Sequence, residues 1–341
     1  EPANIDRLQR SSARYFQRSD ATHVRLDPAS SVLDITSGGL SLGKGEGRWV
    51  FEVATGFESP ETERNDVGSL QTADGIFVFA DVAYRQTKPG LFYRWEAGVS
   101  ASGEANYAGE TQTRSLGFQA NLTWRNYWET FVFFRLQGAA QDERLTRGGP
   151  SMGTPRGWQL SVNQGNRGQG ARELRGYVTA SGDENGGSRI SSGATTGIQV
   201  NSRIRLSLNP TYSRATTARQ YVDTLEGGRA ATFGQRYVFA AVDQTTLAAQ
   251  FRASLILKPD LTLDVYAEPF AASGRYRDYG ELLAPRLRQL LPYGQGGTTV
   301  LMNEDGSRSV RDGTSSFVLG NQDFRELSFR SNVVLRFEYP P

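Results

Sequence analysis

Hydrophobic and polar residues alternate along much of the chain with the period of a β-strand. In residues 116–124 the even positions are apolar, and the odd positions between them are polar or small. After a polar break at Arg125 and Asn126, a mostly apolar set returns at the even positions of residues 128–136. This alternation predicts two strands joined by a tight turn.

The same pattern recurs along the chain and predicts further strands at residues 48–57, 76–85, 91–100, 204–212, 261–268 and 331–339. In residues 234–257 a series of apolar residues at odd positions, from Tyr237 to Leu257, predicts one very long strand or two strands in register, with a hairpin at Asp243 and Gln244 as the alternative. The longest helical candidate, residues 281–291, lies in a predicted loop.

The connections between these strands are of two kinds. Short breaks fall at residues 45–47, 87–90, 125–126, 164–170, 201–203 and 258–260. Long polar stretches fall at residues 58–67, 104–111, 139–155, 182–188, 214–233 and 274–323. The two kinds alternate along the chain, as they do in an antiparallel up-and-down transmembrane β-barrel with short turns on one side and long loops on the other. A sandwich with Greek-key crossings would mix the two lengths at both ends.

We count about 13 strands, and an even number is normal for bacterial barrels. The sequence therefore predicts an all-β fold with about 14 strands in the complete protein. We expect residues 1–30 to be an N-terminal lead-in segment and residues 31–341 to be the barrel domain, with a final strand missing after Pro341.

The two faces of the predicted strands differ in charge. One face carries charged residues on many strands, among them Arg94, Glu96, Glu129, Arg135, Arg175, Arg205, Arg252, Asp264, Glu268 and Arg336. Each unpaired buried charge costs several kcal/mol, so a dry core would not hold this set, whereas a water-filled or plugged lumen would. The alternative is an ordinary antiparallel sheet with one solvated face.

The opposite face is rich in aliphatic and aromatic residues. Aromatic side chains that we expect to form a belt at the membrane interface are Trp95, Trp124, Trp128 and Tyr339.

Composition adds limits rather than a function. The chain has 341 residues, a net charge of +2, one histidine and no cysteine. No apolar stretch reaches the roughly 20 residues of a membrane helix. The near-neutral charge gives no expectation of nucleic-acid binding. Without cysteine and with a single histidine, we expect no metal site and no cofactor.

Two motifs could point to an enzyme. Residues 39–43 fit the G-x-S-x-G pattern around Ser41, but a nucleophile elbow needs a strand, a sharp turn and a helix, and the sequence predicts two strands here. His23 with Asp20 or Asp27 could form a dyad, although a histidine on a short N-terminal strand is more often a surface residue. Residues 182–187 and 303–306 resemble calcium loops but lack the full spacing and are typical of turns.

Two loops are candidates for contact with a solute or for a gate. Arg144 and Arg147 lie in the 139–155 stretch and could contact an anion, or pair with carboxylates on the lumen wall. The 274–323 stretch is roughly 50 residues long, which is unusual for a structureless loop. It contains the gate candidates Tyr276, Tyr279 and Tyr293.

Several segments together resemble a bacterial family of outer-membrane barrels known as domain of unknown function 5916. They are residues 15–20 (YFQRSD), 64–68 (RNDVG), 144–150 (RLTRGGP), 236–240 (RYVFA), 266–270 (YAEPF) and 320–324 (GNQDF). The resemblance runs from about Tyr15 to Tyr339 and implies location and architecture but no established activity. In that family the barrel commonly follows a carbohydrate-binding family 9-like module, which this sequence does not contain.

The sequence thus predicts an outer-membrane barrel of a Gram-negative-type bacterium, with the lipid bilayer as its main partner. We expect passive passage or surface binding of small polar solutes, including saccharides, with lumen charges that orient the solute and a long loop that gates entry. The alternative is an anchor that displays an N-terminal module. A barrel-embedded hydrolase is a third reading, and we do not expect an enzyme.

Overall fold

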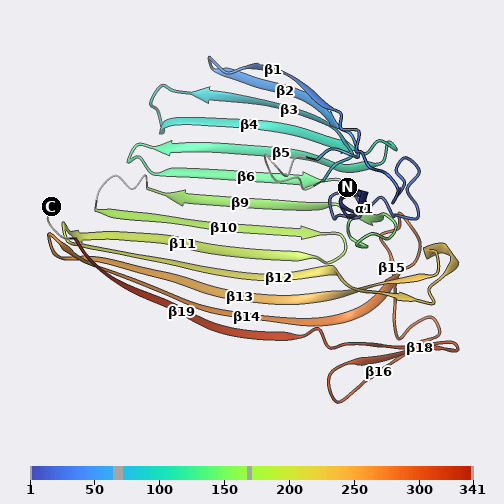
Figure 1. Cartoon of the computed structure of the whole chain (residues 1–341). Coiled ribbons are helices and arrows are strands. Elements are labelled where there is room, and N and C mark those ends of the chain that lie inside the picture. The colour runs from blue at the N-terminus through green and yellow to red at the C-terminus, as the bar shows by residue number, and fades with distance from the viewer. Residues whose placement is uncertain (1, 64–71, 167–170, 339–341) are drawn as a thin grey trace.

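The chain folds around one large antiparallel β-sheet. A computed structural model describes residues 2–63, 72–166 and 171–338, so Tyr339 and the 64–68 segment lie outside the described residues. Fourteen strands form the sheet, and each long strand pairs with its neighbour in the chain order of the sheet strands (Figure 1). The predicted all-β class and antiparallel order are confirmed.

The strands of this sheet are β1 (Ser37–Lys44), β2 (Trp49–Glu58), β3 (Gly75–Gln86), β4 (Phe92–Ala105), β5 (Thr111–Trp124), β6 (Glu129–Gln137), β9 (Gly157–Gly165), β10 (Arg172–Asp183), β11 (Ser188–Asn201), β12 (Ile204–Glu226), β13 (Gln235–Lys258), β14 (Leu261–Leu282), β15 (Leu290–Pro292) and β19 (Phe324–Phe337). Both β15 and β19 pair with β14.

The strongest period-two segments form the predicted strands. β5 and β6 are a hairpin in which Leu122 faces Thr130 and Leu116 faces Leu136. The 234–257 segment is one strand, β13, which pairs with β12 and β14 on either side. Asp243 and Gln244 lie inside this strand and are the cross-strand neighbours of Thr216 and Ala215 in β12, so the alternative of a hairpin there is wrong.

Short turns and longer connections lie at opposite ends of the sheet. β1–β2, β3–β4, β5–β6, β11–β12 and β13–β14 are joined at one end, where the chain reaches Phe337 (Figure 1). The longer connections and the N-terminal segment lie at the other end (Figure 1). We call these the short-turn end and the long-loop end.

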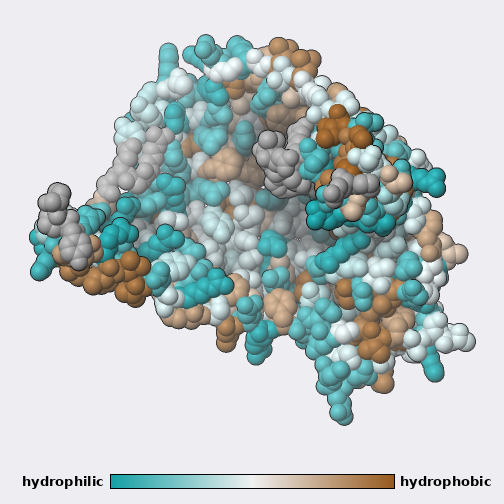
Figure 2. Space-filling model, viewed as in Figure 1, coloured by the Kyte–Doolittle hydropathy of each residue, from teal (hydrophilic) through white to brown (hydrophobic). Residues whose placement is uncertain are grey.

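The sheet is strongly curved, and its two outermost strands are β1 and β19 (Figure 1). Among the described residues, no backbone pairing joins these two edges, so closure of the sheet into a barrel is not seen. One face of the curved sheet is hollowed (Figure 2). We call the hollowed face concave and the opposite face convex.

Two predicted loops contain more strand than the sequence suggested. The 214–233 stretch is mostly strand, because β12 continues to Glu226 beside β13. In the 274–323 stretch, β14 continues to Leu282, and β16 (Thr298–Met302), β17 (Arg308–Asp312) and β18 (Ser315–Leu319) form a separate three-stranded sheet. Pairing with long neighbours extends these strands where the apolar alternation fades.

Most of the buried hydrophobic residues lie at the long-loop end. One cluster joins Val238 and Ala240 of β13 with Val310 and Leu319 of the small sheet. A second cluster contains Met152, Phe239 and Leu282 and other apolar residues around them. This end therefore holds a packed core, whereas the rest of the sheet has little behind it.

The N-terminal segment begins with a helix that the sequence did not indicate, α1 (Pro2–Gln9). The segment then runs across the long-loop end without a strand (Figure 1). It contacts the connection between the short strands β7 (Ala140–Asp142) and β8 (Met152–Thr154). A 3-10 turn, η1 (Ala230–Thr232), lies between β12 and β13. No helix in residues 2–63, 72–166 and 171–338 is long and apolar enough to cross a membrane.

Candidate functional site

The concave face carries a hollow of about 790 Å³ near the short-turn end. Four of the predicted lumen-lining residues line it, namely Arg94, Glu96, Glu129 and Arg175. The Arg94 Nε donates to Thr123 Oγ1 at 3.3 Å, and Glu96 is ion-paired with Arg85. Charged side chains from neighbouring strands therefore meet around one space, as the alternation predicts.

A second hollow of about 810 Å³ lies on the same face over β10 to β14 and β19. Arg205, Arg252 and Asp264 line it, and the Arg252 guanidinium lies 5.3 Å from the centroid of the Tyr266 ring. Glu268 lies beside it and accepts from Tyr266 Oη at 2.7 Å.

Besides Glu268, two of the predicted lumen residues line neither hollow. Arg135 lies over the ring of Phe133, at 5.0 Å from its centroid. Arg336, in β19, is the cross-strand neighbour of Thr262. Both therefore belong to the wall of the sheet between or beyond the hollows.

The aromatic residues predicted for a belt gather near the short-turn end. The ring of Trp95 lies 5.5 Å from Tyr84 and that of Trp124 lies 4.8 Å from Phe92. The Trp124 Nε1 donates to Thr130 Oγ1 at 2.8 Å. Trp128 follows the same turn and lines an apolar groove that also holds Val162, Leu174 and Leu247.

The predicted gate tyrosines are packing residues. Tyr279 and Tyr293 are buried in the cluster between β13 and the small sheet, and Tyr276 packs against it. The Tyr293 hydroxyl donates to Glu281 Oε2 at 3.0 Å. Burial and the Glu281 carboxylate raise the pKa of Tyr293 well above its usual range. These tyrosines tie the small sheet to the wall rather than line a hollow.

The two predicted loop arginines lie between β7 and β8. Arg147 stacks over the Tyr221 ring at 4.5 Å from its centroid, and the Arg144 Nε is 3.9 Å from Asp142 Oδ1. For Arg144 the carboxylate-pairing alternative therefore fits the contacts.

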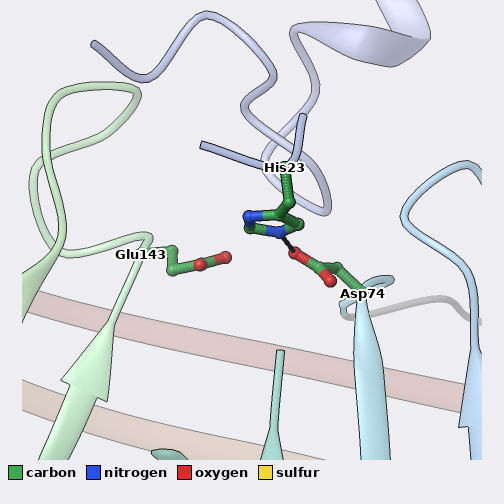
Figure 3. A group of neighbouring side chains, drawn as sticks. All are labelled: His23, Asp74 and Glu143. Atoms are coloured by element: carbon green, nitrogen blue, oxygen red, sulfur yellow. Dashed lines mark hydrogen bonds and ion pairs between the residues drawn. The ribbon is translucent and has the colours of Figure 1, made fainter. Parts of the chain in front are cut away.

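A buried polar cluster fastens the N-terminal segment to the long-loop end. His23 Nε2 lies 2.5 Å from Asp74 Oδ2, just before β3 (Figure 3). Arg18 Nη1 lies 2.5 Å from Glu143 Oε1, and the Arg18 side chain is only 1% exposed. The expectation that His23 is a surface residue is wrong, and its partner is Asp74 rather than Asp20 or Asp27.

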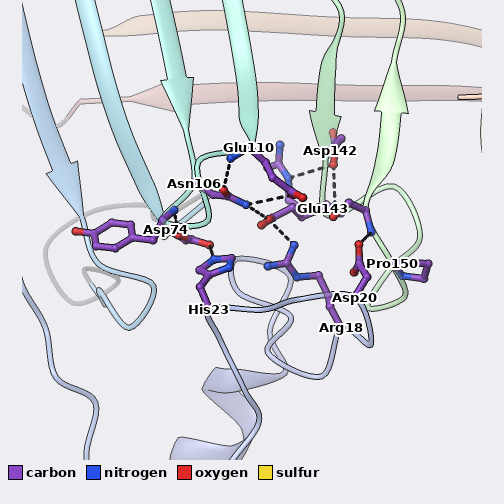
Figure 4. Close-up of polar contacts among 12 residues, drawn as sticks. Arg18, Asp20, His23, Asp74, Asn106, Glu110, Asp142, Glu143 and Pro150 are labelled. Carbon is purple, nitrogen blue, oxygen red and sulfur yellow. Dashed lines mark hydrogen bonds and ion pairs between the residues drawn. The ribbon is translucent and has the colours of Figure 1, made fainter. Parts of the chain in front are cut away.

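Further contacts extend this cluster across the loops between strands. Asn106 Nδ2 donates to Glu143 Oε1 at 2.6 Å, and the Tyr107 backbone N–H donates to Asp74 Oδ1 at 2.9 Å (Figure 4). Asp20 accepts from the Ser151 backbone N–H at 3.0 Å and lies 3.4 Å from Arg286. The N-terminal segment is thus held by ion pairs and a hydrogen bond to the connections before β3, between β7 and β8, and after β14.

Three side chains of this cluster have the chemistry of metal ligands. His23, Asp74 and Glu143 each offer a ligand atom, and these atoms lie within 4.8 Å of one another (Figure 3). However, His23 and Asp74 bind each other, and Glu143 is engaged by Arg18 and Asn106. Each of the three side chains thus already has a partner, so these contacts do not require a metal ion. We call this set of contacts the latch.

The candidate hydrolase motif lacks the geometry of a nucleophile elbow. Ser41 lies in the middle of β1, where it pairs with Ala54 of β2. A strand interior does not present a serine on a sharp turn before a helix. The contacts of His23 support a role in the latch.

The family described as domain of unknown function (DUF5916) matches residues 11–286, which is well over half of the chain. The chain belongs to this family. The DUF5916 match includes β1 to β14 and the polar cluster, and it ends before the small sheet and β19. It is therefore shorter than the predicted resemblance. No curated protein matches the chain.

Proposed function

We propose that this chain is the wall of an outer-membrane β-barrel that passes small polar solutes, with its N-terminal segment across the long-loop mouth. The observation that carries this proposal is the contrast between the two faces of the same strands. The concave face is hollowed and charged. The convex face exposes apolar side chains such as Val78, Val99 and Leu116, at 56%, 55% and 62%.

A lipid environment explains this contrast better than an aqueous one does. Exposed apolar area is unfavourable in water at roughly 25 cal/mol per Å², and contiguous apolar surface of this kind marks an interaction site or a membrane. A strand needs about 9–11 residues to cross a bilayer. Most strands from β2 to β11 have 9 to 14 residues, which suits that requirement.

The proposed barrel places the short turns on the periplasmic side and the longer connections outside, as in bacterial barrels. The latch around Arg18 and His23 would then close the outer mouth. Because Arg18 is buried with its carboxylate partner, removal of its charge leaves Glu143 unpaired and weakens the latch.

The test is solute flux through liposomes that contain the protein. We expect slow entry of a neutral monosaccharide with the native chain and several-fold faster entry with Arg18→Ala. The matched control is Arg10→Ala, because Arg10 pairs with Asp6 at an exposed position of the same segment. Inserted protein that gives no flux with either variant would contradict passage.

A second candidate function is supported by the latch itself. A mouth that is closed by buried ion pairs also suits an anchor that presents an N-terminal module at the cell surface. Full insertion without flux, even in Arg18→Ala, is the outcome that this second function predicts.

A further inference from the structure

A third hollow, of about 520 Å³, lies at the long-loop end of the sheet. It is lined by the ends of β5, β6, β9, β10, β11 and β12 and by the β7–β8 connection. Its charged lining residues are Arg114, Arg189, Arg219, Asp142 and Asp183. A solute that enters from this end meets this hollow before the other two.

The two carboxylates of this hollow are engaged locally. Asp183 Oδ1 accepts the backbone N–H groups of Asn185 at 2.7 Å and Gly187 at 3.0 Å, which closes the β10–β11 turn. Asp142 Oδ1 accepts the Arg144 backbone N–H at 2.7 Å. Neither carboxylate is paired with an arginine that lines the hollow.

The three arginines that line this hollow have no carboxylate within ion-pair distance among the described residues. Within the part of the chain that the structure describes, no ion pair joins Arg114, Arg189 or Arg219 to a carboxylate. The nearest contact of Arg189 is a long one, from Nη1 to Ser213 Oγ at 3.5 Å. Asp183 acts on Arg219 electrostatically, but three arginines face two aspartates in the lining, so a surplus of one positive charge remains.

Two buried polar atoms at this hollow have no hydrogen-bond partner, namely Arg219 Nη1 and Gln112 Nε2. Both are donors. A buried donor without an acceptor is unfavourable, so acceptor oxygens of a ligand would be favoured at this hollow. Water could satisfy the donors, but only an anion would also balance the charge.

We propose that this hollow binds the anionic group, a carboxylate or a phosphate, of a small polar solute. The inference rests on the proposed passage and names the class of solute that it takes. Guanidinium groups suit such oxygens because their parallel N–H groups can donate two hydrogen bonds at once. Arg219 and Arg189 would hold the anionic group, and Gln112 offers a further donor in the lining of the hollow.

The test is binding to the full chain in detergent micelles, measured by isothermal titration calorimetry. The probes are glucose 6-phosphate, glucuronate and glucose, which share a ring and differ in charge. We expect at least one of the two anionic probes to bind and glucose not to bind. We also expect Arg219→Gln to weaken binding about tenfold or more, as loss of a charge-assisted pair should.

The control is Arg203→Gln, because Arg203 is exposed in the β11–β12 turn at the opposite end; its binding should be unchanged. If Arg219→Gln does not fold, Arg189→Gln carries the test with a several-fold loss. Equal affinity for glucose, or unchanged binding in both hollow variants, would overturn the inference.

Failure of the inference and failure of the proposed passage remain distinct. Flux in liposomes without anion binding in micelles would refute the site and leave the passage standing. Binding in micelles without flux would support the site and refute the passage.

Discussion

At the scale of single residues, the structure concentrates its electrostatics where segments far apart in the chain meet. Arg236 and Glu281 have side chains that are 5% and 2% exposed and lie 2.8 Å apart. Arg236 also lies 2.8 Å from Asp312, so one guanidinium joins β13, β14 and the small sheet. Loss of one partner from a buried pair leaves a charge that water cannot reach.

Arg236 keeps Asp312 as a partner, so Glu281→Gln should lower the free energy of unfolding by about 1.5–3 kcal/mol, the usual contribution of a hydrogen bond to a charged group. The control Asp6→Asn removes one partner of the exposed Arg10 pair and should cost less than about 1 kcal/mol. Denaturant unfolding of both variants checks the difference. Equal effects would mean that the buried pair does not hold the small sheet.

Tyr293 provides a pH-dependent test in the same cluster. Because burial and Glu281 raise its pKa in the folded state, its contribution to stability is present below about pH 10, the ordinary tyrosine pKa, and is lost as the pH rises above it. Tyr293→Phe should be less stable than the native chain at about pH 8, since a hydrogen bond to a charged group is lost. The gap should shrink at about pH 11, as measured by unfolding midpoints. A gap that stays constant would contradict the shift.

At the scale of strands, adjacent positions test the assignment of the two faces. Phe118 and Gln119 are neighbours near the middle of β5, and Phe118 faces Val99 and Phe134 on the convex side. In a lipid-facing strand, Phe118→Arg should cost about 2–4 kcal/mol of folding in a bilayer, whereas Gln119→Arg, on the concave side, should cost much less. Folding titrations in lipid vesicles measure both. Similar costs at the two positions would argue that neither face meets lipid.

Strand periodicity shows how far the sequence reaches. The β5–β6 hairpin and the length of β13 follow from the alternation of Leu116 to Leu136 and of residues 234–257, because a half-buried strand imposes a period of two on its side chains. The ends of β12 and β14 were missed, because they are extended by pairing with β13 rather than by an apolar pattern.

The polar cluster could not be found in the same way. His23 and Asp74 are 51 residues apart, and nothing in the local pattern around either residue indicates that they meet. The N-terminal segment has no strand period, so only the three-dimensional arrangement shows that it packs against the long-loop end. By contrast, the charged concave face was predictable, because odd and even positions of a strand point to opposite faces of the sheet.

At the scale of the whole molecule, the proposed barrel has a simple physical signature. A closed barrel in detergent keeps its shape in an unheated gel sample and runs faster than the heated, unfolded chain. We expect that shift, with a β-type circular dichroism spectrum, for the protein folded in detergent or lipid. A protein that stays monomeric in buffer without detergent and shows no shift would contradict the membrane proposal. The chain would then be a water-soluble protein with a curved sheet.

The free edges of the sheet set a rule of direction. Every pairing along the path from β1 to β19 is antiparallel, and thirteen strands lie on that path, so the two edge strands point the same way. Were they to meet directly, they would pair in parallel. A strand that bridged the two edges with antiparallel pairing on both sides would have to run from the short-turn end to the long-loop end. It would also make the number of strands around the barrel even.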